Sequence, residues 1–271
     1  MKVFVNAIPK SGTNLLQRLM ELLGLEYDKL GVAASLILGK NNFPKKIIRG
    51  NILGNNPFIV GYDVEVPISE FWMKRRFKKI SNGKYVSGHA NFTEKIHKLL
   101  IDNCLKTIII IRDPRSILLS NAKYFFKRED YYLYKLYKSK DLSQRISIAL
   151  DGGYYDEIGL YLNSLDYQLE NLKSWKNKDE VLIVKFEDLI GEKGGGSNGV
   201  QFEKISEIME FIGMSDLIES KFINNIANNL FGNSVTFNSG LINSWEKEIS
   251  KSQLSVINEK LFSHMEYWNY S

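Results

Sequence analysis

Short apolar runs alternate along the chain with longer segments of helical periodicity. The runs predict strands at Lys2–Ile8, Phe58–Tyr62, Tyr85–Gly88, Lys106–Ile111 and Val181–Lys185. The segments predict helices at Asn14–Leu23, Thr93–Asp102, Arg115–Lys127, Ile158–Trp175, Phe202–Ile212, Leu217–Asn229 and Lys251–Tyr267. Strands that alternate with helices indicate an α/β fold. The run from Thr107 to Ile111 has no polar alternation, which is typical of a strand covered by helices on both faces.

Two stretches depart from this alternation. The segment at about 127–156 carries tyrosines among charged residues, and we interpret it as an inserted cover segment and not as part of the sheet. Residues 193–199 read Lys-Gly-Gly-Gly-Ser-Asn-Gly, a low-complexity patch that predicts a flexible loop. Neither stretch is long enough to separate domains, so we expect residues 1–271 to form a single domain.

Composition narrows the class of protein. Hydrophobic residues make up 44% and charged residues 25%, which is ordinary for a globular protein and excludes disorder and collagen-like repeats. The net charge of +5 suits an anionic small molecule as well as nucleic acid. With no arginine-rich stripe or nucleic-acid motif, we expect no nucleic-acid partner. The lone cysteine, Cys104, excludes an intrachain disulfide scaffold.

No segment reads as membrane-spanning. The longest uncharged apolar stretch, Leu30–Gly39, is shorter than the ~20 residues that a spanning helix needs. The first apolar run is followed at once by Pro9 and Lys10, whereas a signal peptide needs a longer apolar core. We therefore expect a cytoplasmic protein without an integral membrane segment.

The first chemical signal is the turn Pro9–Asn14, between a predicted buried strand and an amphipathic helix. Such a turn aims free backbone N–H groups and the helix dipole at one point. Gly12 allows close backbone approach, Lys10 adds a charge, and Ser11 and Thr13 add hydroxyl donors. We interpret the turn as a cradle for phosphate or sulfate, although a plain Ser/Thr helix cap explains it equally well in isolation. It is not a Walker A loop, because the lysine precedes the glycine.

Two motifs together resemble those of a known family. Pro9–Leu16 resembles the 5′-phosphosulfate loop of sulfotransferases that use 3′-phosphoadenosine 5′-phosphosulfate (PAPS). Ile111–Ser120 is similar to their 3′-phosphate motif, in which an arginine at a strand end and a serine eight residues later hold the phosphate; Arg112 and Ser120 have this spacing. Weaker matches follow in the family's order at residues 186–191 and 240–245.

The resemblance implies a three-layer α/β/α sandwich with a central parallel sheet, P-loop-like in its first turn. Two anion cradles at the carboxyl ends of parallel strands would form the usual crevice of an open sheet, and PAPS carries an anionic group at each end. PAPS would be the donor and 3′-phosphoadenosine 5′-phosphate (PAP) the product, with no metal. The implied donor-binding residues are Lys10, Ser11, Gly12, Thr13, Asn14, Arg112, Ser120, Phe186, Asn238, Ser239 and Gly240.

His89 is the candidate general base. It follows a predicted strand, at a point where α/β enzymes place catalytic groups. The resemblance to the sulfotransferases implies that a histidine at this position removes the acceptor's proton and that Lys10 neutralises charge on the leaving phosphate. Asp63 and Glu65 are rival bases, because some relatives use a carboxylate, but both also read as solvated loop residues.

Several other side chains have two interpretations each. Phe186 stacks on adenine or ends a buried strand, and Trp245 packs on the nucleotide or in the core. Arg115 is a surface residue at a helix start or a phosphate contact. The tyrosines of residues 131–155 line an acceptor pocket or pack on the sheet as a lid. His97 and the more C-terminal His264 read as structural or surface residues.

The last nucleotide loop departs from the family pattern. Many relatives have Arg-Lys-Gly where this chain has Asn238-Ser239-Gly240, so both positive charges are missing. Neutral hydrogen bonds are worth about 0.5–1.5 kcal/mol against about 1.5–3 for charged ones. Either Lys193, Lys247 or Lys251 replaces the lost pair, or the donor binds weakly.

These observations predict a PAPS-dependent sulfotransferase that moves a sulfuryl group to a hydroxyl or amine. The acceptor is a small molecule, a lipid or a glycan, and the sequence carries no signal for its identity or for the oligomeric state. The alternatives are a P-loop-type nucleotide phosphotransferase and a catalytically degenerate nucleotide-binding protein of the same fold.

Overall fold

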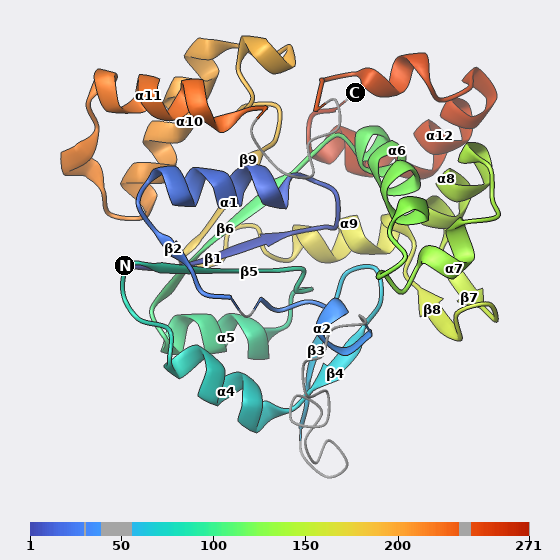
Figure 1. Ribbon diagram of the computed structural model, residues 1–271, viewed down its shortest axis with the longest axis horizontal. Helices are drawn as coiled ribbons and strands as arrows, with labels where there is room; N and C mark the ends of the chain where they lie inside the picture. Colours follow the sequence, from blue (N-terminus) through green and yellow to red (C-terminus); the bar gives the residue numbers. More distant parts are fainter. Residues whose placement is uncertain (30, 39–55, 233–239, 271) are drawn as a thin grey trace.

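A computed structural model describes residues 1–29, 31–38, 56–232 and 240–270. Its centre is a sheet of parallel strands in the order β2-β5-β1-β6-β9 (Figure 1). The strands span Glu26–Tyr27 (β2), Lys84–Gly88 (β5), Lys2–Ala7 (β1), Leu105–Ile111 (β6) and Val181–Lys185 (β9). The predicted α/β fold with a central parallel sheet is confirmed, and the short edge strand β2 is an addition to it.

Helices cover both faces of this sheet, which gives three layers (Figure 1). Val3 and Val5 of β1 pack into one core, and Phe4 packs into the other, so alternate side chains serve opposite faces. The first core contains buried residues of α1 (Thr13–Leu22), α10 (Asn198–Phe211) and α11 (Ser220–Leu230). The second contains those of α4 (Glu70–Lys78), α5 (Glu94–Asp102) and α9 (Leu165–Lys173). Two-sided burial explains the apolar runs at Val3–Val5 in β1 and Ile108–Ile111 in β6.

A group of helices lies beyond the carboxyl ends of the strands (Figure 1). It comprises α6 (Pro114–Tyr124), α8 (Leu142–Asp151) and α12 (Lys251–Tyr267). Helix α6 begins as its sequence predicts, because Asp113 caps it by accepting from the backbone N–H of Arg115 and Pro114 takes the first turn. The shorter pieces are α2 (Ser35–Leu38), α7 (Tyr134–Tyr137), η1 (Phe125–Lys127), η2 (Glu192–Gly194), η3 (Ser215–Leu217) and η4 (Ser244–Lys247).

Two predicted elements are wrong in part. The strand predicted at Phe58–Tyr62 is β3 (Phe58–Val60), but it pairs antiparallel with β4 (Val66–Ile68) outside the central sheet. The helix predicted at Ile158–Trp175 begins only at Leu165, because Ser164 caps it and β8 (Leu160–Leu162) precedes it. Local apolar patterns mark extended or helical tendency, whereas strand partners are set by distant residues.

The two irregular stretches are more ordered than the sequence suggests. The Tyr-rich cover segment contains α7, α8 and β7 (Gly153–Tyr155), which forms an antiparallel hairpin with β8. The glycine patch is not a flexible loop: it contains η2 and the start of α10, with Ser197 as the helix cap. Within it the backbone N–H groups of Gly194 and Gly196 both donate to the carbonyl of Gly191, at 3.1 and 2.8 Å.

No helix in the described ranges has both the length and the apolar character needed to cross a membrane.

Candidate active site

A cavity of about 460 Å³ opens where the carboxyl ends of the central strands meet. Asn6 of β1 pairs with Gly88 of β5, and Ala7 pairs with Ile110 of β6. This register brings the segments that follow the strands to one edge of the sheet. The predicted residues that line the cavity are Lys10, Gly12, Thr13, Asn14, His89, Arg112, Ser120, Phe186 and Gly240. Asn238 and Ser239 lie outside the described residues.

Gly12 sets the shape of the loop after β1. Its φ of +117° is in the left-handed region, and a Cβ there would lie 2.7 Å from Cδ2 of Phe186 and 3.0 Å from Cδ1 of Ile110. The loop therefore rests directly on the Phe186 ring. Thr13 begins α1, and its buried Oγ1 has no hydrogen-bond partner among the residues described. An unsatisfied buried hydroxyl in a cavity wall fits a ligand oxygen.

The hydroxyl role predicted for Ser11 does not hold in this structure. The side chain is fully buried, and its Oγ donates to the carbonyls of Ile8 at 2.6 Å and Ile110 at 3.1 Å. Its backbone N–H also donates to the Ile8 carbonyl. Ser11 thus ties the loop to β6 and does not line the cavity.

Lys10 lies against an aromatic face. Its Nζ is 3.4 Å from the ring centroid of Tyr124, whose hydroxyl accepts a hydrogen bond from Arg128 at 2.5 Å. Burial, together with the nearby charges of Arg112 and Arg128, lowers the pKa of Lys10 to about 8. The ammonium is therefore mostly charged at neutral pH and close to losing its proton.

Arg112 is a buried cation with room for an anion. Its guanidinium stacks 4.1 Å from the ring centroid of Phe186, and its Nε has no hydrogen-bond partner in the part of the chain that the structure describes. Burial lowers the pKa of Arg112 from its ordinary value. A buried N–H without a hydrogen-bond partner is costly, so an incoming phosphate oxygen would be favoured here.

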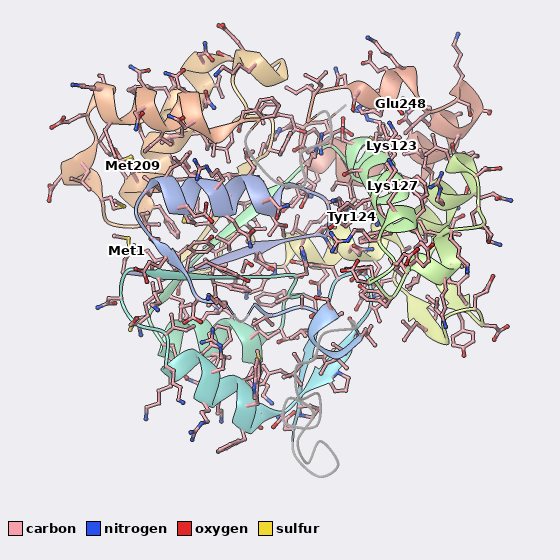
Figure 2. All side chains as sticks on the ribbon, viewed as in Figure 1. Met1, Lys123, Tyr124, Lys127, Met209 and Glu248 are labelled. Carbon is pink, nitrogen blue, oxygen red and sulfur yellow. The ribbon has the colours of Figure 1, made fainter. Side chains whose placement is uncertain are left out.

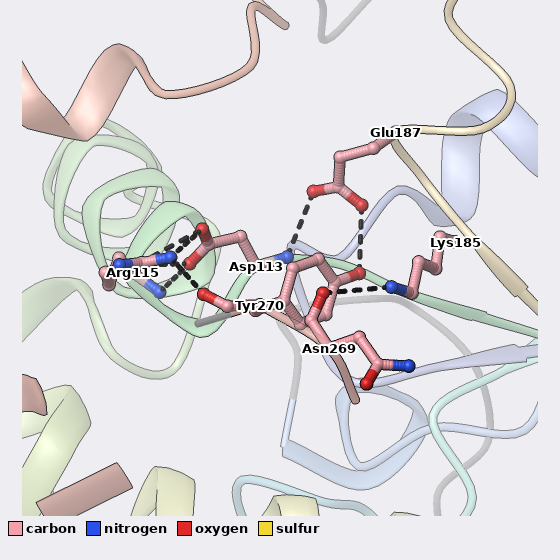
Figure 3. A network of polar contacts seen from close by, with 6 residues as sticks. All are labelled: Asp113, Arg115, Lys185, Glu187, Asn269 and Tyr270. Carbon is pink, nitrogen blue, oxygen red and sulfur yellow. Dashed lines mark hydrogen bonds and ion pairs between the residues drawn. The ribbon is translucent and has the colours of Figure 1, made fainter. Parts of the chain in front are cut away.

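The carboxylates beside Arg112 are committed elsewhere (Figure 3). Glu187 accepts from the backbone N–H of Asp113 at 3.1 Å and from the hydroxyl of Tyr270 at 2.9 Å. Arg115 pairs with the Asp113 carboxylate at 2.8 Å and donates to the Tyr270 carbonyl at 2.6 Å. This network ties the C-terminal residues to the β6–α6 turn and leaves the Arg112 guanidinium for a ligand.

His89 presents one ring nitrogen with a free lone pair. Its Nδ1 lies 2.7 Å from the carbonyl oxygen of Ala7, which can only accept, so Nδ1 carries the hydrogen and Nε2 does not. Burial lowers the pKa of His89, the hydrogen bond to Ala7 and the nearby Asp63 oppose this shift, and the Lys10 charge adds to it. A neutral imidazole on the cavity wall has the protonation state that a general base requires.

The rival carboxylates face other partners. Asp63 is buried, and its Oδ2 accepts from the Tyr132 hydroxyl at 2.5 Å while its Oδ1 accepts from the next backbone N–H at 3.0 Å. Burial raises the pKa of Asp63. Glu65 is exposed and accepts from the Tyr167 hydroxyl at 2.8 Å. Neither carboxylate lines the cavity, so the geometry favours His89.

The structure distinguishes between the two interpretations that the sequence left open for several side chains, because some of them line the cavity and others do not. Trp245 is buried in the core, and the Arg115 guanidinium lies 4.1 Å from its ring centroid; neither lines the cavity. Phe186 lines the cavity while it supports both cradles. Tyr131 lines the cavity, and its ring stacks on Phe125 with centroids 4.4 Å apart. His97 and His264 do not line it.

Asn6 is a positioning residue that the sequence analysis missed. It is fully buried in β1, and its amide donates to the carbonyl of Ala90 and accepts from the N–H of the same residue, both at 2.8 Å. This double hydrogen bond fixes the residue directly after His89. A polar residue inside an otherwise apolar strand is the signal that could have identified it.

Within the described ranges, no group of three or more His, Cys, Asp or Glu side chains could hold a metal ion.

The fold and the cavity define an α/β protein with two cation-bearing cradles at the carboxyl edge of an open parallel sheet, where such folds bind anionic ligands. The family model of the sulfotransferase domain matches residues 1–268, and the chain belongs to this family of sulfuryl-transferring enzymes. A search of curated protein sequences finds no match.

Solved structures share the fold. Mouse sulfotransferase SULT7A1, solved with PAP, aligns with a TM-score of 0.64 at 14% identity, covering 97% of this chain and 84% of that one. Retinol dehydratase, solved with retinol and PAP, aligns with a TM-score of 0.59 at 14% identity, covering 97% and 81%. The same enzyme with androsterone and PAP aligns with a TM-score of 0.53 at 13% identity, covering 97% and 80%.

We predict that Asn6→Ala lowers the free energy of unfolding by about 1–3 kcal/mol, because it leaves the buried N–H and carbonyl of Ala90 unsatisfied. Urea unfolding measures the loss. Asn229→Ala, which removes an exposed amide on α11, is the control and should change the value by less than about 0.5 kcal/mol. Equal losses in the two variants would remove the special role of Asn6.

Proposed function

We propose that the chain binds PAPS along this cavity and transfers its sulfuryl group to a hydroxyl or amine. The phosphosulfate would occupy the Lys10–Asn14 loop, and the 3′-phosphate would lie at Arg112 and Ser120. The observation that carries the proposal is the pair of cradles, each with a buried polar atom that lacks a partner among the described residues: Thr13 Oγ1 in one and Arg112 Nε in the other. The presence of PAP in the structures of SULT7A1 and retinol dehydratase supports the same donor.

The chemistry follows from the placement of His89 and Lys10. His89 Nε2 takes the proton of the acceptor O–H or N–H, and the freed electron pair attacks the sulfur. The bond between sulfur and the bridging phosphate oxygen breaks, and its electron pair stays on that oxygen. Lys10 neutralises the charge that develops there, so PAP leaves as the phosphate.

The acceptor would be a small molecule that reaches His89 along the aromatic side of the cavity. Tyr124 and Tyr131 line this side and offer apolar faces with polar tips. Retinol dehydratase, solved with retinol or androsterone, supports this class of acceptor.

We also propose that residues 1–271 form one domain that acts in the cytoplasm. The exposed free thiol of Cys104 suits a reducing compartment.

Calorimetric titration of PAP and of ATP tests the donor. PAP should bind without magnesium, and ATP should bind more weakly whether or not magnesium is present. Magnesium-dependent ATP binding in preference to PAP would point to a phosphotransferase instead.

Lys10→Ala should lower the single-turnover rate of sulfuryl transfer by about 10²-fold or more, the usual effect of losing one donor to the transition state. Labelled PAPS and quenched-flow detection measure the rate. Lys127→Ala, on the exposed end of η1, is the control and should transfer at the wild-type rate. An unchanged rate in the Lys10 variant would exclude it from the mechanism.

His89→Asn should leave the dissociation constant of PAP nearly unchanged and lower turnover by about 10²–10⁴-fold, because it removes the general base without removing a phosphate contact. Glu65→Gln is the matched control, because Glu65 accepts from Asn91, two residues after His89, without lining the cavity, and this variant should retain turnover. If Asp63→Asn abolishes turnover while His89→Asn does not, the base is Asp63.

The pH profile of kcat/KM for PAPS should reflect the free enzyme's lysine. Lys10 faces Arg112, Arg128 and the Tyr124 ring, and its pKa of about 8 means that it loses its charge as the pH rises through this value. We expect kcat/KM to fall above about pH 8. Because burial lowers the pKa of His89, the imidazole should remain deprotonated at pH values somewhat below the ordinary pKa of histidine. A profile that is flat through pH 8 and beyond would contradict the assignment of Lys10.

A further inference from the structure

A lysine outside every predicted motif also faces the donor cavity. Lys123 lies near the end of α6 and forms an ion pair with Glu248, the residue after η4 (Figure 2). Both residues line the cavity, and each side chain is 32% exposed. The pair joins two segments that are far apart in the sequence, directly at the wall of the site.

The position of Lys123 on α6 is the first argument for a role in binding. Ser116, Ser120 and Lys123 all line the cavity, and their spacings of four and three residues place them on one helical face. Lys127, in the short turn after α6, is exposed and does not line the cavity. Helix α6 therefore presents a polar stripe to the ligand that includes Lys123.

The segment opposite α6 gives the second argument. Gly240 and Ser244 line the cavity together with Glu248, so Lys123 sits where this segment meets α6. The lysines predicted as replacements for the missing pair, Lys193, Lys247 and Lys251, do not line the cavity. One of them, Lys193, instead donates to the carbonyl of Asn228 at 3.3 Å.

Electrostatics gives the third argument. A carboxylate on the wall of a cavity that binds anions repels the ligand unless a cation neutralises it. Lys123 neutralises Glu248 in the free protein. A partly exposed ion pair is weak, whereas a lysine ammonium has three donors and a phosphate dianion is a stronger acceptor. Lys123 therefore gains by exchanging Glu248 for phosphate, and the Glu248 carboxylate that it leaves opposes part of this gain by repelling the phosphate.

We propose that Lys123 binds the 3′-phosphate of the donor and leaves Glu248 to do so, which makes this ion pair a determinant of selectivity for nucleotides phosphorylated at the 3′ position. This inference rests on the proposed PAPS function.

The test compares PAP with adenosine 5′-phosphate, because the two differ only in the 3′-phosphate. Dissociation constants are measured by calorimetry at fixed ionic strength for the wild type, Lys123→Met, Glu248→Gln, the double variant and the control Lys127→Met. Lys123→Met should weaken PAP about tenfold, the effect of one charged hydrogen bond, and leave adenosine 5′-phosphate unchanged. Glu248→Gln should tighten PAP about two- to fivefold, because it releases Lys123. Lys127→Met should change neither constant.

The double variant separates contact from neutralisation. If Lys123 contacts the phosphate, the double variant lacks this contact, and its affinity for PAP is well below that of the wild type. If Lys123 serves only to neutralise Glu248, the double variant regains wild-type affinity, and the proposal is overturned. An unchanged ratio of the two constants in Lys123→Met also overturns it. Should that variant fail to fold, the absence of tightening in Glu248→Gln overturns the proposal by itself. If the wild type does not prefer PAP, the PAPS function itself is wrong.

Discussion

The parallel register of β1 with its neighbours is the constraint on which the site depends. Because Ala7 pairs with Ile110 and Asn6 pairs with Gly88, the loop after β1 emerges beside His89 and Arg112. The strands pair through backbone hydrogen bonds, and apolar cores lie on both faces of the sheet. A slip of one residue would turn every side chain of β1 to the opposite face and so into the wrong core. The double hydrogen bond from Asn6 extends this rigidity past the end of β5 to the residue after His89.

Aromatic faces hold the principal cations of the site. Lys10 lies on Tyr124 and Arg112 lies on Phe186, so each charge is stabilised from one side. A carboxylate would stabilise these cations more strongly, but it would also have to be displaced by an anionic ligand. The network around Glu187 and Asp113 keeps the nearest carboxylates occupied with other donors. Burial is the main cause of the lowered pKa values of Lys10 and Arg112, and for Lys10 the neighbouring arginine charges add to it.

The local sequence predicted the strands and turns that depend on interactions between residues close together in the chain. The two-sided apolar strands β1, β6 and β9 were found with bounds within one residue, and the turn at Pro9–Asn14 lies where its composition indicated. The partner of β3 and the start of α9 were missed because distant residues and a single serine cap decide them. Ser11 was misassigned for the same reason: its hydroxyl is captured by the carbonyl of Ile110, on a strand nearly a hundred residues away.

The same distinction explains why a sequence motif points to Arg112 and Ser120 but not to Lys123. The first two belong to one short motif, whereas Lys123 gains its position only when η4 packs against the end of α6. Its counter-ion also differs in kind from those of the other cations. An aromatic ring remains in place when phosphate binds, but Glu248 and the phosphate compete for the same ammonium. Binding at this end of the cavity is thus an exchange of partners, and its strength depends on how weakly a partly exposed carboxylate holds Lys123.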